Sequence, residues 1–414
     1  MAPYYFSLPE SELEIIELSL FEKCLLSRIV HTLRLGVYMY QKRSDKAEVI
    51  NKALPGAVDC EAYIKSAFSS EVLSDKLFPL RHTGSSMQFI LKSMPIPSNP
   101  FELSAINIFQ LCIWRTFAFG TCDRLAAIEL EDEVEGDDGP DLDHLCAIIR
   151  GSGNGALKLA VPAYGQLQIL KAKVPSMLSS FWELAQDISA SITAKMAPPT
   201  FANLHNLLIA KSISSVPQYG LIPWLLISDF FEYGLCQPPT LHDLAEHMTN
   251  GKAAGPCNAI KIIALETGEV APADADELAN VLGAIFEVLQ KPPKKCPTIE
   301  KLAEDCKAIQ GRVLSVVDLE HALCKISRQN SRVMAGNWPK KTAVVVGKSA
   351  KGKKRGAEER EGGDKAPGVA DEASSGRDGN FGDGEEGMER GQVDGVDDVV
   401  EPAAKKRKTD AAGG

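Results

Sequence analysis

The stretch SELEIIELSLFEKCLLSRIVHTLRLGVYMYQK, residues 11–42, has apolar side chains at helical spacing along its whole length. Ser11 and Glu14 have the spacing of a capping box, in which two residues satisfy each other's backbone N–H groups at a helix start. Apolar residues then recur every three or four positions along one side: Leu13, Ile16, Leu20 and Cys24. The stretch predicts one helix from about 11 to 42 and a mainly α fold.

Two further apolar runs, 103–119 and 221–235, are long enough to be compared with membrane spans. Polar and charged residues interrupt both of them: Asn107, Gln110 and Arg115 in the first, Asp229 and Glu232 in the second. Both runs are too short and too polar to cross a bilayer. They predict core helices, and no membrane contact is expected.

One segment has strand character. Residues 145–149 and 157–161 are apolar and flank the glycine-rich stretch 151–155, which predicts a short β-hairpin over about 145–161. An acidic stretch at 129–143 is predicted to be a solvated loop. The remaining chain predicts an irregular multi-helix bundle, divided into helical regions 1–196 and 197–335, with a disordered tail over 336–414.

Cysteine usage and charge limit the classes of function. The ten cysteines include no Cys-x-x-Cys pair, so no zinc site is expected, and isolated thiols without a signal peptide fit a reducing compartment. Of the net charge of −10, residues 339–414 contribute −1 from 15 cations and 16 acids, which leaves −9 for the body. So acidic a body is not a general nucleic-acid surface.

Three patterns resemble small-molecule or metal sites, and none is complete. Gly151-x-Gly153 fits a dinucleotide fingerprint, but Pro162 and Gly165 fall where its helix should continue. Residues 344–349 match only the end of a phosphate-binding loop. His242 and Glu246 are one helical turn apart, but no second ligand cluster accompanies them. No catalytic residue, cofactor or metal is therefore assigned.

A basic helix precedes the tail. Ser315 and Asp318 cap a predicted helix to about 333, and the helical wheel places Lys325, Arg328 and Arg332 on the side opposite the apolar residues. Two segments, 239–246 and 297–304, also share a Pro-Thr start and a Leu-Ala-Glu sequence. The segment 297–333 therefore carries a rival hypothesis, a helix-turn-helix-like unit whose three cations contact DNA phosphates. A solvated face is the simpler alternative.

The tail carries two basic clusters. Residues 357–401 hold ten glycines and fifteen acids against four cations, a composition typical of disorder. The run Lys405, Lys406, Arg407 and Lys408 follows Pro402, and an earlier cluster comprises Lys351, Lys353, Lys354 and Arg355. Short basic runs of this kind are typical of nuclear import signals, so we expect an import carrier as a partner and a nuclear location.

Around residue 200 the chain resembles a known family. Pro198-Pro199-Thr200-Phe201, with His205, Pro217 and Gly220, resembles the fungal mating-type regulators named for the His-Pro-Gly or Pro-Pro-Phe residues of their domain. The resemblance covers residues 198–220 and implies a nuclear regulator of sexual development.

Taken together, these features lead us to expect a non-enzymatic nuclear regulatory protein that acts through protein partners, with a role in transcription or mating type. DNA binding through 297–333 is the alternative. An enzyme would be favoured only if His144, His242 or His247 met acidic residues in a pocket.

Overall fold

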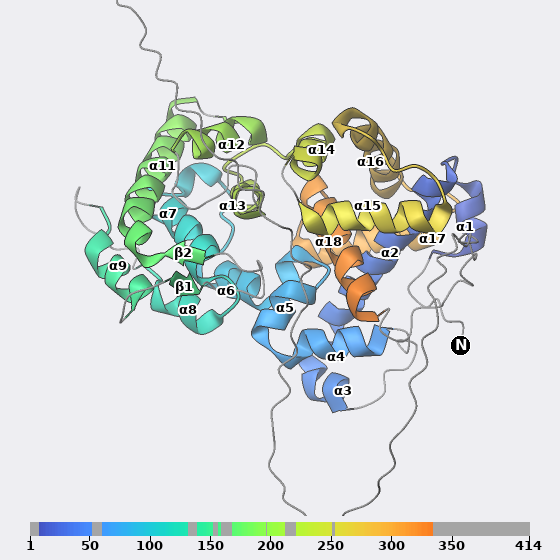
Figure 1. Ribbon diagram of the computed structural model, residues 1–414, viewed down its shortest axis with the longest axis horizontal. Coiled ribbons are helices and arrows are strands. Elements are labelled where there is room, and N and C mark those ends of the chain that lie inside the picture. Colours follow the sequence, from blue (N-terminus) through green and yellow to red (C-terminus); the bar gives the residue numbers. More distant parts are fainter. Residues whose placement is uncertain are drawn as a thin grey trace, which may run out of the picture. The chain divides into compact units, whose positions relative to one another are not determined.

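The computed structural model describes residues 8–51, 60–130, 139–151, 156–158, 168–195, 197–211, 221–250 and 253–333. The chain divides into two units, 1–344 and 345–414, and every described residue belongs to the first. The fold is mainly α, as predicted (Figure 1). The predicted tail lies outside the described residues.

Most of the described chain is helical. The α-helices of the first half are α1 (Glu10–Ile15), α2 (Leu20–Gln41), α3 (Lys46–Asn51), α4 (Glu61–Ser69), α5 (Glu71–Leu77), α6 (Ser85–Ser93), α7 (Ala105–Ile113), α8 (Cys122–Ala127) and α9 (Leu142–Arg150). Those of the second half are α11 (Val174–Lys195), α12 (Phe201–Ala210), α13 (Leu221–Glu232), α14 (Leu241–Asn250), α15 (Ala254–Thr267), α16 (Ala275–Gln290), α17 (Pro297–Gln310) and α18 (Val316–Val333). Short 3-10 turns lie at Arg43–Asp45, Arg81–Thr83, Pro100–Glu102 and Lys171–Lys173, and a π-helical turn, Trp114–Ala118, extends α7.

The single helix predicted over 11–42 is wrong in one respect, because the chain breaks between α1 and α2. Ile16 is extended, with φ −81° and ψ 123°, and its side chain is buried. The capping box is formed by Ser19 and Glu22 at the start of α2, since the Glu22 backbone N–H donates to Ser19 Oγ at 3.2 Å. Ser11 lies inside α1 instead. The stretch contains two capping-box spacings, and the second is the one used.

The predicted hairpin over 145–161 is also wrong. Its first arm belongs to α9, which Asp141 caps by accepting from the backbone N–H of His144 at 2.8 Å. Its second arm overlaps β1 (Ala156–Lys158), which pairs antiparallel with β2 (Gln168–Leu170). A short apolar run does not by itself distinguish strand from helix, and here the aspartate cap selects the helix. Residues 131–138 of the acidic stretch lie outside the described residues.

Both long apolar runs form core helices, as predicted. The first becomes α7 and the π-helical turn, and the second becomes α13, whose residues 222–230 are all buried. Within the described residues, no helix combines the length and apolar character that crossing a membrane requires. Four of the polar residues that interrupt these runs, Gln110, Arg115, Asp229 and Glu232, are buried, whereas Asn107 is half-buried in the capping box of α7.

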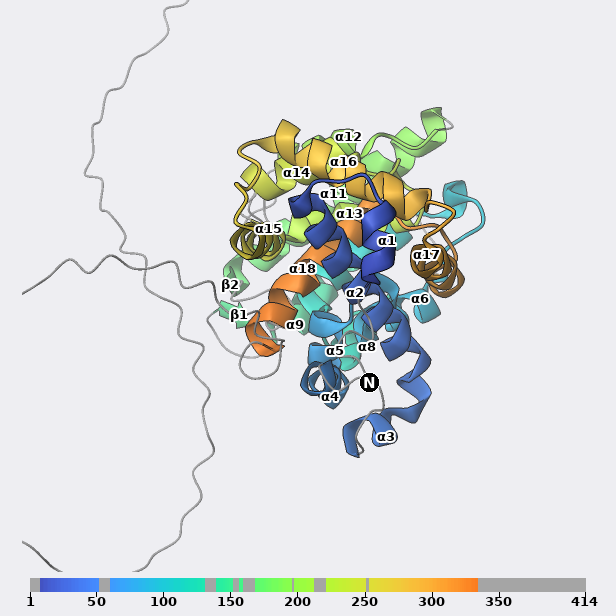
Figure 2. The same cartoon turned by 90° about the vertical axis from the view of Figure 1, so that its right-hand side faces the viewer.

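One apolar core links the two ends of the described chain, since its buried members extend from Leu8 to Ile326. Helix α18 packs against α15 and α2, while α16 contacts α14, α17 and α2 (Figures 1 and 2). Elsewhere α11 packs against α7 and α9, and α13 contacts α7 and α12. A smaller apolar cluster, from Leu35 to Phe78, lies between α2, α4 and α5. Helix α18 therefore lies in the interior.

Candidate functional site

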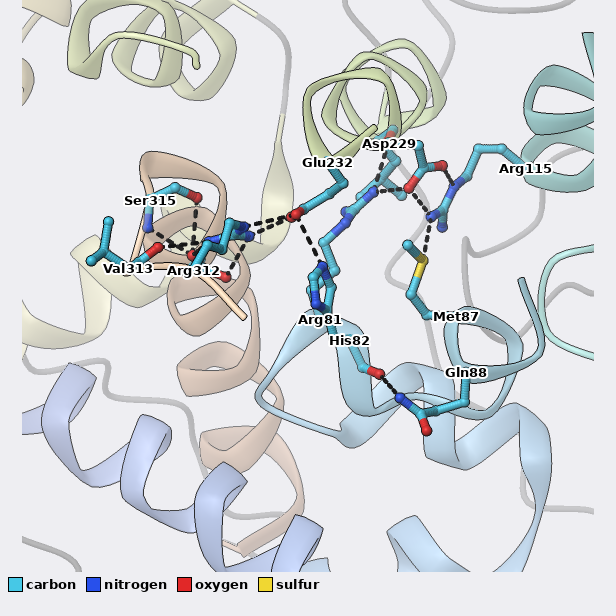
Figure 3. Close-up of polar contacts among 12 residues, drawn as sticks. Arg81, His82, Met87, Gln88, Arg115, Asp229, Glu232, Arg312, Val313 and Ser315 are labelled. Atoms are coloured by element: carbon cyan, nitrogen blue, oxygen red, sulfur yellow. Dashed lines mark hydrogen bonds and ion pairs between the residues drawn. The ribbon is translucent and has the colours of Figure 1, made fainter. Parts of the chain in front are cut away.

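The largest concentration of buried charge in the described chain begins at Asp229 of α13. Two arginines from other segments contact its carboxylate (Figure 3). Arg115, in the π-helical turn, donates through Nε to Oδ2 at 2.5 Å and through Nη2 to Oδ1 at 2.5 Å. Arg81, in the 3-10 turn before α6, donates to Oδ1 and, at 2.9 Å, to the carbonyl of Leu225. All three charged side chains are almost fully buried.

The packing around this triad is specific. Arg115 Cζ lies 3.7 Å from the centre of the Phe119 ring, and Nη2 lies 3.8 Å from the sulfur of Met87. A planar guanidinium can bind a carboxylate along one edge while stacking on an aromatic face. Arg115 and Asp229 therefore join α7 to α13 through a bidentate ion pair, and Arg81 attaches the segment before α6 to the same carboxylate.

One helical turn after Asp229, Glu232 forms the second half of the network (Figure 3). Arg312, in the turn between α17 and α18, donates through Nε to Glu232 Oε2 at 2.8 Å and through Nη1 to Asp318 Oδ2 at 2.5 Å. Nε2 of His82 lies 3.0 Å from Glu232 Oε2. Asp318 Oδ2 also accepts from the backbone N–H of Ser315 at 2.7 Å, which caps α18.

Charge pairing decides the protonation of this half. Burial by itself would raise the pKa of Glu232, but His82 and Arg312 more than offset it and hold the pKa below its usual range. Burial would lower the pKa of Arg312, while Asp318 and Glu232 together raise it above its ordinary value. Glu232 is therefore an anion and Arg312 a cation, so neither is a proton donor or acceptor near neutral pH.

A third group of buried polar residues lies between α5 and α18. The ammonium of Lys325 donates to the carbonyls of Lys76 at 2.7 Å and of Asp75 at 3.3 Å, at the C-terminal end of α5. Asp75 accepts from the backbone N–H of Ser86 at 2.9 Å and from its hydroxyl at 2.6 Å. Burial lowers the pKa of Lys325 to about 8 and raises that of Asp75 to about 6.

This position of Lys325 corrects the sequence analysis. Lys325 is 5% exposed, so it is not available to the DNA phosphates assigned to it. The last carbonyls of a helix lack backbone partners and attract a cation, which explains why α5 holds it. Arg328 is half-buried, and the side chain of Arg332 lies outside the described residues. So do both import clusters, at 351–355 and 405–408.

The weaker sequence candidates also have definite places. Nε2 of His242 lies 3.3 Å from Asp276 Oδ1, and Nδ1 lies 3.9 Å from Glu246, with all three side chains largely exposed. His247 faces the interior and stacks on Trp224 with ring centres 4.4 Å apart. Across the described ranges, no three His, Cys, Asp or Glu side chains are arranged to hold a metal ion. Residues 344–349 and most of 151–156 lie outside those ranges.

In the sequence, Arg115, Asp229 and Glu232 stand out only as interruptions of apolar runs. A buried charge needs a partner of opposite sign, so a cation in one core helix and two acids in another were a usable signal for pairing. Arg81 and Arg312 carried no comparable signal, because each lies in a turn.

The ion pairs of this network connect side chains from several helices. Each carboxylate of Asp229, Glu232 and Asp318 is already paired with an arginine, and general acid–base catalysis requires a titrating group within reach of a substrate. The arrangement ties α13 to α7, to the segment before α6 and to the start of α18. Comparison of the chain with protein-family models, curated proteins and solved structures finds no match.

Proposed function

We propose that this chain is a non-enzymatic nuclear regulatory protein that acts through protein partners. The observation that carries the proposal is the run Lys405–Lys408, four consecutive cations that follow Pro402 in an acidic, glycine-rich stretch. An import carrier would bind this run, and the cluster at 351–355 is a second signal 49 residues before it.

The resemblance at 198–220 suggests the process in which such a regulator acts, namely mating-type control of sexual development. In the folded chain Thr200 caps α12, and Phe201 lies against Trp224 with ring centres 5.0 Å apart. Pro217 and Gly220 lie outside the described residues. This narrower role rests on the resemblance alone and is the second part of the proposal.

The import signal is tested with a fluorescent fusion of the full chain in which Lys405, Lys406, Arg407 and Lys408 become alanine. We expect nuclear accumulation to fall, and to be lost when the 351–355 cluster is also replaced. The control replaces four exposed lysines of the body with alanine: Lys291, Lys294, Lys295 and Lys301. Full nuclear accumulation of the variant lacking both clusters would overturn the proposal.

The rival DNA-binding function is separated by titrating the full chain with duplex DNA at several salt concentrations. Affinity that falls steeply with salt would indicate phosphate contacts. Any binding at low salt should be the same in the unmodified chain and in Arg328→Ala. The reason is that Lys325 faces α5 and the body is acidic. Salt-dependent binding that is lost in Arg328→Ala would favour the rival.

A further inference from the structure

The C-terminal end of α15 carries the most exposed large apolar side chains of the described chain. Leu265 is 85% exposed and Val270 is 92% exposed. Between them, Gly268 ends the helix in the left-handed conformation, with φ +75°, which a residue with a Cβ adopts only with strain. The turn therefore holds Val270 outside the helix, on a short segment that leads to α16.

The first turn of α2 lies against this end of α15. Figure 2 views α15 along its helix axis. The backbone N–H of Phe21 donates to Glu269 Oε2 at 3.3 Å, and Arg28 pairs with Glu266 at 2.6 Å. These contacts fix the 265–270 segment beside Leu20, which is itself 59% exposed. The three exposed apolar side chains thus come from α2 and from the end of α15, which are joined by a hydrogen bond and an ion pair.

Acidic side chains outnumber basic ones around these residues, where Lys23 lies one turn after Leu20 and Arg28 is paired with Glu266. From 262 to 290 the sequence contains no lysine or arginine, and its acids include the exposed Glu269, Asp274, Asp276 and Glu277. Glu17, just before α2, is exposed as well. The C-terminal end of α15 adds the partial negative charge of its last carbonyls. The nearest exposed cation along α15, Lys261, is one turn before Leu265.

We infer that Leu20, Leu265 and Val270, with the acids around them, form a docking surface for a cationic amphipathic helix of a partner protein. Exposed apolar side chains bordered by charge mark interaction sites, and a helix that carries apolar residues on one face and lysines beside it would match both features. Addition of a partner strand would need a free strand edge, which α2, α15 and the turn between α15 and α16 do not supply. The inference rests on the proposed action through protein partners.

The test uses the full chain and a fluorescently labelled helical peptide of about five turns, with leucines on one face and lysines on the other. A second peptide carries glutamate in place of each lysine. We expect the lysine peptide to bind and the glutamate peptide not to bind. The double variant Leu265→Ser with Val270→Ser should bind the lysine peptide at least about tenfold more weakly, because the apolar contact area is lost.

A matched control replaces two exposed apolar residues elsewhere, Ile96→Ser and Ile148→Ser, and should leave the affinity unchanged. Hydrogen exchange should show peptide-dependent protection at 265–277 and at the start of α2. Both pairs of residues are exposed, so unfolding temperatures should stay near that of the unmodified chain. Equal affinity of the two double variants, or protection elsewhere, would overturn the inference. Nuclear location is measured separately, so the two proposals fail independently.

Discussion

Replacing Asp229 with asparagine tests whether the buried network holds the helices together. The carboxylate accepts from Arg81 and from two nitrogens of Arg115, and the side chains of all three residues are at most 3% exposed. Asparagine has nearly the same shape, so the packing is preserved. The substitution removes the carboxylate charge that both guanidinium groups contact, so two buried cations lose their ion-pair partner.

The magnitude follows from that imbalance. Removing one partner of a buried ion pair destabilises a protein by about 3–5 kcal/mol, because the remaining charge cannot regain its hydration. Asparagine keeps one acceptor oxygen, so we expect about 3 kcal/mol for Asp229→Asn. That is a large part of the roughly 5–15 kcal/mol by which native proteins are stable.

The assay is urea unfolding of the full chain, followed by the helical circular dichroism signal. We expect a lower midpoint with an unchanged slope, since the surface exposed on unfolding stays the same. A double-mutant cycle with Arg115→Met measures the pairing, and the two changes together should cost about 1–3 kcal/mol less than their sum. The control Asp276→Asn removes an exposed carboxylate beside His242 and should leave the midpoint unchanged.

Two outcomes would refute this reasoning. A loss below about 1 kcal/mol for Asp229→Asn would mean that the arginines find other partners or water. Strict additivity in the cycle would mean that Arg115 and Asp229 do not interact energetically despite their contact.

Two smaller predictions concern packing and pH. At Gly84 a Cβ would lie 2.6 Å from Oδ1 of Asp75, so Gly84→Ala should destabilise the fold by about 1–3 kcal/mol in urea unfolding, whereas the same change at Gly283, whose nearest neighbour lies at 3.6 Å, should be neutral or stabilising. Burial lowers the pKa of His247 from 6.5 to about 4, so the unfolded chain takes up that proton first as the pH falls. The contribution of His247 to stability should therefore decline by up to about 3 kcal/mol between pH 6.5 and pH 4. The decline should be smaller in His247→Phe, and an identical pH profile for that variant would contradict the role given to His247. For the glycines, a loss of stability in Gly283→Ala equal to that in Gly84→Ala would contradict the packing argument.

The positions of many helices follow from local pattern. The composition of the run 221–235 predicts a core helix, and α13 occupies residues 221–232 of it. Where two residues both have the spacing of a helix cap, the local pattern does not determine which of them begins the helix. Ser11 and Ser19 both have the spacing of a capping box, but only Ser19 forms one, and burial of Ile16 in the common core accompanies the break between α1 and α2.

The hairpin error has a different origin. Residues 145–149 suit a strand or a helix, and strand pairing depends on a partner elsewhere in the chain. Here β1 pairs with the segment 168–170 rather than with 145–149.

By itself the sequence determined a mainly α body with its apolar faces, an acidic overall charge and the two basic clusters of the tail. These properties depend on residue type and on spacing along a few turns. The helical wheel placed Lys325 opposite the apolar residues of its helix, where a solvated side chain was expected. Only the tertiary structure decided that the end of α5 faces it, so that a residue expected at the surface is buried.

The same holds for Arg115 and Asp229, which are 114 positions apart in the chain. Each was visible as a charge inside an apolar run, and the need of each for a partner was a local fact. Which charge meets which depends on how the helices pack, because the ion pair forms only after both runs have been buried against each other.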